Sequence, residues 1–172
     1  MSSSNLFRAP ARAPFFRELL IWLLATMAFC LIPNVFAADD VRTKVLSNSD
    51  FSSAREALIE SIEAEGLVVS AVLPFADMLA RTADALEQGA SPFLKAEIIQ
   101  FCSARLARQL VDEDSAQIAL CPLTITVFST RQAPGLVSYA YRSPGKSSAG
   151  RKAAGELLEK LLGRASQLAR TR

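Results

Sequence analysis

The sequence predicts a single α+β domain that follows an export signal, and three observations lead to this prediction. First, the 172 residues are 51% apolar and 21% charged, which suits one globular domain with a sizeable core. Second, beyond position 37, stretches that alternate between apolar and polar residues are interleaved with stretches of helical periodicity. Third, residues 95–130 read as strand, short helix and longer strand, and the other elements can cover this central unit.

Residues 1–37 carry the features of a secretory signal peptide. A basic start precedes an apolar run over residues 19–32, and Val35-Phe36-Ala37 supplies the small-x-small end. We therefore predict cleavage after Ala37, export to the periplasm and no stable membrane insertion of the mature domain. An uncleaved membrane anchor is the alternative, although a span takes about 20 apolar residues.

Charge and histidine content exclude several function classes. Residues 1–37 hold three arginines, no lysine and a single acidic residue, Glu18, so this segment carries the whole formal charge of +2. The mature domain is therefore formally neutral and lacks the positive charge that attracts nucleic acid. The chain has no histidine, which excludes Ser-His-Asp and Cys-His nucleophile systems, histidine-ligated zinc or copper, and axial-histidine haem. We expect no metal centre, no cofactor and no conventional hydrolase activity, and the sequence identifies no catalytic residue.

The mature chain begins with a predicted strand and a predicted helix. Residues 41–47 alternate between apolar and polar side chains, as strands do. Asp50 and a Ser53-x-x-Glu56 capping box mark the start of a helix, and Gly66 marks its end. The apolar stripe of this helix is Phe51, Ala54, Leu58 and Ile62.

A second strand and helix are predicted before the central unit. Residues 67–73 are rich in β-branched side chains and predict a largely buried strand that Pro74 ends. Asp77 is expected to cap a helix that continues to Glu87. The residues spaced for one face of that helix are Leu79, Ala83 and Leu86.

The central unit begins with a strand over residues 95–102, and Ser103 is expected to cap the helix that follows. In the strand, Ile99 and Phe101 share one face, and the opposite face holds Ala96, Ile98 and Cys102. The helix ends at Asp112-Glu113-Asp114. Three acids at a helix C-terminus oppose the helix dipole, which indicates a solvated turn, with a cation site as the alternative.

The last predicted elements are a hairpin and a long helix. A strand opens at Cys121 and ends at Thr130, with Leu123, Ile125 and Val127 on the same face as Cys121. A turn over residues 132–135 leads to a partner strand over residues 136–143, in which Val137, Tyr139 and Tyr141 are aligned. Ser148 then caps a helix whose ordered part we expect to end near Gly163. Its main stripe is Ala149, Ala153, Leu157, Leu161 and Ala165.

Two cysteines, Cys102 and Cys121, remain after Cys30 leaves with the signal. If the third and fourth strands are antiparallel, both cysteines lie at the same end of the sheet. An oxidising compartment and an even number of cysteines favour a disulfide. A redox or sulfur-transfer pair is a second interpretation, because a helix N-terminus near Cys102 can stabilise a thiolate. Two inert buried thiols are the third.

The segments DFSSAREALIESIEAEGLVV, IIQFCSARLARQL and LCPLTITVFS resemble a bacterial and archaeal family known as domain of unknown function 302. The resemblance extends from about Asp50 to Arg164. Cys102 and Pro122 match the family pattern. Two departures are Ser103-Ala104 where the family has Asn-Pro, and Leu123 where the family has its second cysteine, because Cys121 lies two residues earlier.

The resemblance implies a two-layer α+β domain with a mainly antiparallel sheet and helices packed on one face. It also implies a homodimer, and it brings no known reaction or cofactor. We therefore expect a periplasmic module that binds a small molecule or a protein partner, using a pocket or the open face of the sheet. The alternative is a thiol-based redox or sulfur-transfer protein that uses Cys102 and Cys121.

Overall fold

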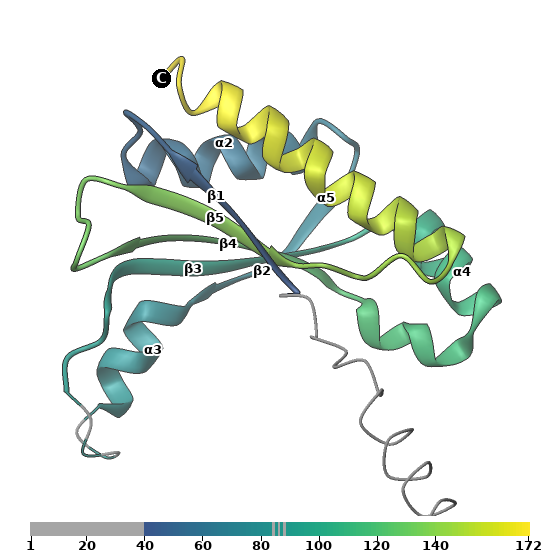
Figure 1. The fold of residues 1–172 in the computed structure, drawn as a ribbon, viewed down its shortest axis with the longest axis horizontal. Coiled ribbons are helices and arrows are strands. Elements are labelled where there is room, and N and C mark those ends of the chain that lie inside the picture. The colour runs from purple at the N-terminus through teal and green to yellow at the C-terminus, as the bar shows by residue number, and fades with distance from the viewer. Residues whose placement is uncertain (1–39, 84, 86, 88) are drawn as a thin grey trace, which may run out of the picture. The chain divides into compact units, whose positions relative to one another are not determined.

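The computed structural model describes residues 40–83, 85, 87 and 89–172, so the predicted signal peptide lies outside the described residues. From residue 40 onward the chain belongs to one compact unit built on a five-stranded sheet. Every pair of neighbouring strands is antiparallel, which confirms the α+β class with an antiparallel sheet (Figure 1). The order across the sheet is β1 (Val41–Leu46), β5 (Val137–Arg142), β4 (Leu123–Thr130), β3 (Phe93–Cys102) and β2 (Val68–Pro74).

The core lies between one face of the sheet and three helices, α2 (Phe51–Glu63), α4 (Ala104–Glu113) and α5 (Ala149–Leu168). In Figure 1, α2 and α5 lie together over this face. The strand faces predicted to be apolar are the buried ones: Ile99, Phe101, Leu123, Ile125, Val127, Val137, Tyr139 and Tyr141. The hydroxyl of Tyr139 donates a 2.6 Å hydrogen bond to the carbonyl of Ala54, which fixes α2 on the central strands.

Both ends of α2 follow from local sequence. The Asp50 carboxylate accepts hydrogen bonds from the Ser53 hydroxyl and from the backbone N–H groups of Ser53 and Ser52, and these bonds, the hydroxyl's first, lower the pKa of Asp50. Asp50 is therefore the capping residue. Gly66 adopts a φ of 72°, a conformation that favours glycine, in the turn before β2.

Helix α5 begins as predicted, because the Ser148 hydroxyl accepts a hydrogen bond from the N–H of Arg151. The expectation that order ends near Gly163 was wrong, since the helix continues to Leu168. Burial explains the extension, because Ala165 and Ala169 lie in the core, and the Arg172 guanidinium also forms ion pairs with the carboxylates of Glu56 and Glu60. The chain end is thus held against α2.

The three acidic residues at the end of α4 are exposed to solvent, as expected, but each also makes a specific contact. Asp112 pairs with Arg108 one turn earlier in the helix, and Asp114 caps the 3₁₀ helix η1 (Ser115–Leu120). Glu113 accepts a 2.7 Å hydrogen bond from the N–H of Gly150 in the first turn of α5. Hydrogen bonds from Ser148 and then from Gly150 lower the pKa of Glu113. The Glu113 carboxylate thus lies at the N-terminus of α5, where the helix dipole stabilises a negative charge.

Two strands differ from their predictions. Strand β2 was expected to be largely buried, but it forms one edge of the sheet, and Val68 is 75% exposed. The fourth strand was expected to open at Cys121, but β4 begins at Leu123, because residues 115–120 form η1 and Cys121 ends that turn. The peptide bond between Cys121 and Pro122 is cis.

The short helix α3 (Phe75–Thr82) lies against the opposite face of the sheet from α2 and α5 (Figure 1). It starts directly after β2 without a side-chain cap and ends at Thr82, so the predicted Asp77 cap and extension to Glu87 were wrong; Leu86 lies outside the described residues. Phe75 packs edge-on against Phe93, and Phe93 against Phe128. These aromatic contacts cover one end of this face, the second face of the sheet. No helix in the described part of the chain is long and apolar enough to cross a membrane.

Candidate functional site

The antiparallel pairing of β3 with β4 brings the two cysteines to the same end of the sheet, as expected. Phe101 is opposite Leu123, so Cys102 and Pro122 are the next residues along the two strands. Cys102 is exposed, whereas Cys121 is half-buried and packs against the core. Both are free thiols in this structure.

The surroundings of Cys121 disfavour the ionised form of its thiol. Burial raises the pKa of Cys121, and the charge and hydrogen bonding of the neighbouring Cys102 raise it further. The two thiols therefore interact directly, and a negative charge on one disfavours a negative charge on the other. The arrangement suits a pair in which Cys102 meets solvent and Cys121 stays protonated.

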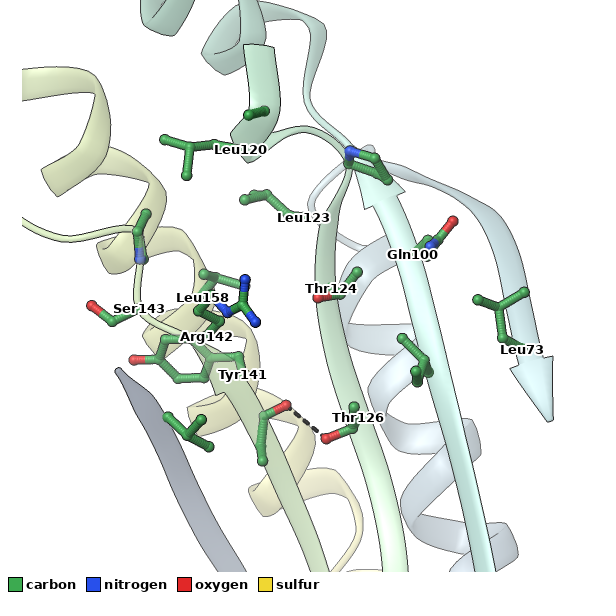
Figure 2. A pocket seen from close by; sticks show the side chains of 16 residues that line it. Leu73, Gln100, Leu120, Leu123, Thr124, Thr126, Tyr141, Arg142, Ser143 and Leu158 are labelled. Atoms are coloured by element: carbon green, nitrogen blue, oxygen red, sulfur yellow. Dashed lines mark hydrogen bonds between the residues drawn. The ribbon is translucent and has the colours of Figure 1, made fainter. Parts of the chain in front are cut away.

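A groove of about 480 Å³ lies on the half of the second sheet face that α3 leaves uncovered. One row of side chains crosses all five strands here, because Leu73 is opposite Ile98, Ile98 opposite Thr126, Thr126 opposite Ala140 and Ala140 opposite Thr43. Figure 2 shows the side chains that line this groove. They come from the sheet, from the end of η1, from the loop after β5 and, at Leu158, from α5.

The groove is apolar with a few polar groups. Leu73, Ile98, Leu120 and Pro122 supply apolar surface. Arg142 carries the one full charge among the described lining residues, and it forms no ion pair with other described residues. The Tyr141 hydroxyl donates a hydrogen bond to Glu159, which does not line the groove, and burial, and then the charge of Glu159, raise the pKa of Tyr141.

Hydrogen-bonding capacity remains on the groove floor. The Thr126 hydroxyl donates to the carbonyl of Ala140 at 3.0 Å. Within the described part of the chain, the amide of Gln100 and the hydroxyl of Thr124 have no hydrogen-bond partner, and both line the groove. A few convergent polar groups on an apolar surface are typical of a small-molecule site.

The cysteines are close in sequence to two residues that line this groove. Pro122, which follows Cys121, and Gln100, which precedes Cys102 by two residues on the same strand face, both line it. The sequence predicted the cysteine pair and named a pocket or the open face of the sheet as the binding surface, but it did not predict the residues that line the groove. The alternating polar positions of β4, Thr124 and Thr126, were the available signal, because they mark the face away from the core.

The other ionisable residues of β3 have structural roles. The Arg55 Nε atom lies 2.6 Å from an Oε atom of Glu97, which joins α2 to the sheet. The Lys95 ammonium lies 5.5 Å from the centre of the Phe51 ring. Among the described residues, no group of three or more acidic or cysteine side chains is arranged to hold a metal ion.

These features define a small α+β domain with an antiparallel sheet, a half-open sheet face and two neighbouring thiols. The chain belongs to the family described as domain of unknown function DUF302, whose model matches residues 43–169.

Comparison with solved structures supports the fold. A similar structure is described as the crystal structure of an uncharacterized conserved protein DUF302 from Bacillus stearothermophilus. It has 17% sequence identity and a TM-score of 0.60, and the match covers 77% of this chain and all of that chain. At this identity the likeness shows the fold alone. Comparison with curated proteins gave no match.

Proposed function

We propose that the protein is an exported binding module whose groove holds a small ligand with an apolar body and an acidic group. The observation that carries the proposal is the unpaired Arg142 beside an apolar groove floor. An apolar ligand body contacts Leu73 and Ile98, and its acidic group accepts charge-assisted hydrogen bonds from the guanidinium. Gln100 and Thr124 provide further hydrogen-bonding groups.

The test uses anilinonaphthalene sulfonate, a fluorescent apolar anion. The single tryptophan of the chain, Trp22, is in the signal, so the mature domain contributes no tryptophan emission. We expect Arg142→Gln to weaken binding of the probe about tenfold, because the variant keeps the side chain polar but removes the charge.

Arg105→Gln is the matched control, because Arg105 is also exposed but lies on α4 outside the groove. It should bind the probe as tightly as the unchanged protein. Equal affinities for the Arg142 and Arg105 variants would show that the probe binds elsewhere and would remove the support for this site.

Export belongs to the same proposal. The basic start, apolar run and Val35-Phe36-Ala37 end support secretion with cleavage after Ala37. Intact mass of protein released from the periplasm should correspond to a chain that starts at Ala38. A membrane-bound product that retains Met1 would contradict export with cleavage.

We further propose that the mature protein is a C2 homodimer that pairs two copies of β2. This edge strand has no charged residue, and its Val68 and Leu73 are 75% and 42% exposed. The other edge, β1, carries Arg42 and Lys44, charges that discourage pairing between edges. Antiparallel pairing of β2 with its copy is compatible with a two-fold axis.

Light scattering at tens of micromolar tests the dimer. The unchanged mature protein should have twice the mass of the chain, and Val68→Lys should shift it to monomer through like-charge repulsion and lost apolar contact. Val45→Lys is the control, because Val45 is 58% exposed on β1. A monomeric unchanged protein, or equal dissociation by both substitutions, would refute the interface.

A further inference from the structure

We propose that Cys102 and Cys121 form a dithiol site that is oxidised to an intramolecular disulfide by small dialkyl disulfides. The site is independent of ligand binding in the groove. It rests on three observations: the two residues lie one and two positions beyond the last pair of the β3–β4 register, both thiols are free, and only one of them is exposed.

The end of the β3–β4 pairing brings the two residues near each other. In the β3–β4 pairing, Phe101 is opposite Leu123, and the strands continue to Cys102 on one side and through Pro122 to Cys121 on the other. Neighbouring strands lie about 4.7–4.9 Å apart, and disulfides join Cα atoms that are about 4.4–6.8 Å apart. The contribution of Cys102 to the raised pKa of Cys121 agrees with this proximity.

The difference in exposure assigns the two sulfurs different steps. Exposed Cys102 is the sulfur that a dissolved disulfide can reach. Its thiolate attacks one sulfur of the small disulfide, forms a mixed disulfide and releases the other half as a thiolate. Half-buried Cys121 then loses its proton to solvent, attacks the Cys102 sulfur and releases the second small thiol. Two electrons pass from the protein dithiol to the small disulfide.

The product would join the end of β3 to Cys121, the residue that follows η1, and close the segment that contains α4 and η1. Because Pro122 and Gln100 line the groove, the bond would form close in sequence to two of its lining residues. The raised pKa of Cys121 makes it a poor first nucleophile and suits it to the second step, in which it attacks a sulfur already held beside it.

The experiment treats reduced mature protein, residues 38–172, with oxidised glutathione and follows intact mass and free thiols after denaturation. The unchanged protein should lose both thiols and two hydrogen masses and carry no glutathione. Cys121→Ser should stop at one glutathione on Cys102, because the resolving thiol is missing. Cys102→Ser should react at least about tenfold more slowly, because Cys121 is half-buried and its pKa is raised.

Three outcomes would overturn the proposal. The first is unchanged protein that keeps both thiols or accumulates two glutathione adducts. The second is a disulfide between two chains, seen as a doubled mass that disappears on reduction. The third is a Cys102→Ser variant that reacts as fast as Cys121→Ser. Probe binding by the Arg142 variant is measured separately under reducing conditions, so failure of one proposal does not imply failure of the other.

Discussion

The substitution Leu58→Ala should lower the free energy of unfolding by about 2–5 kcal/mol. Leu58 lies in the middle of α2 with its side chain fully buried in the core between the helices and the sheet. Truncation removes apolar surface that folding takes out of water and leaves a cavity that the surrounding side chains fill only partly. Urea unfolding followed by circular dichroism measures the loss.

Ile118→Ala is the control for Leu58→Ala, because it also removes an aliphatic side chain, but Ile118 is 67% exposed in η1. Its effect should stay within about 0.5 kcal/mol. Equal losses for the two substitutions would contradict the placement of the core between α2 and the sheet.

The second large effect concerns Gly150 in the first turn of α5. A Cβ atom at this position would lie 2.8 Å from Oε2 of Glu113 and 3.0 Å from Cδ2 of Leu110, which is fully buried. Gly150→Ala should therefore destabilise the domain, because overpacking costs about 1–3 kcal/mol and the gain in helix propensity is at most about 1 kcal/mol. It also displaces the carboxylate that accepts the Gly150 N–H.

Gly163 in the same helix provides the matched control, since a Cβ atom there would have no other atom within 4 Å. Gly163→Ala should raise stability by roughly 0.5–1 kcal/mol, because alanine is the better helix former. Thermal unfolding should therefore show a lower midpoint for Gly150→Ala and a higher one for Gly163→Ala. An increase for both would mean that α4 does not approach α5 this closely.

The elements that sequence predicted well are those determined by neighbours along the chain. The helix starts at Asp50, Ser103 and Ser148 each have a side chain that accepts a backbone N–H, an interaction that spans only two or three residues. The buried faces of β3, β4 and β5 follow from alternation, because successive side chains of a strand point to opposite faces. The nearness of Cys102 and Cys121 followed once β3 and β4 were taken as antiparallel.

The sequence could not predict the residues that line the groove or the environment of β2, because both depend on strand order. An apolar strand such as β2 fits the centre of a sheet or its edge equally well, and pairing with β3 alone leaves it at the edge. The groove needs five strands in register and a helix, α3, that covers only the other end of that face. Neither the register of the five strands nor the position of α3 can be read from a single segment of the sequence.

By itself, the sequence determined the α+β class, the buried faces of β4 and β5, the helix caps at Asp50, Ser103 and Ser148, and the presence of two cysteines beyond position 37, because these follow from local periodicity and residue chemistry. Only the tertiary structure decided which residues serve distant partners. Glu113 opposes the dipole of its own helix α4, yet it caps the start of α5, 37 residues away in sequence. Arg142 and the polar side chains of β3 and β4 likewise share one groove only because non-local hydrogen bonding aligns their strands.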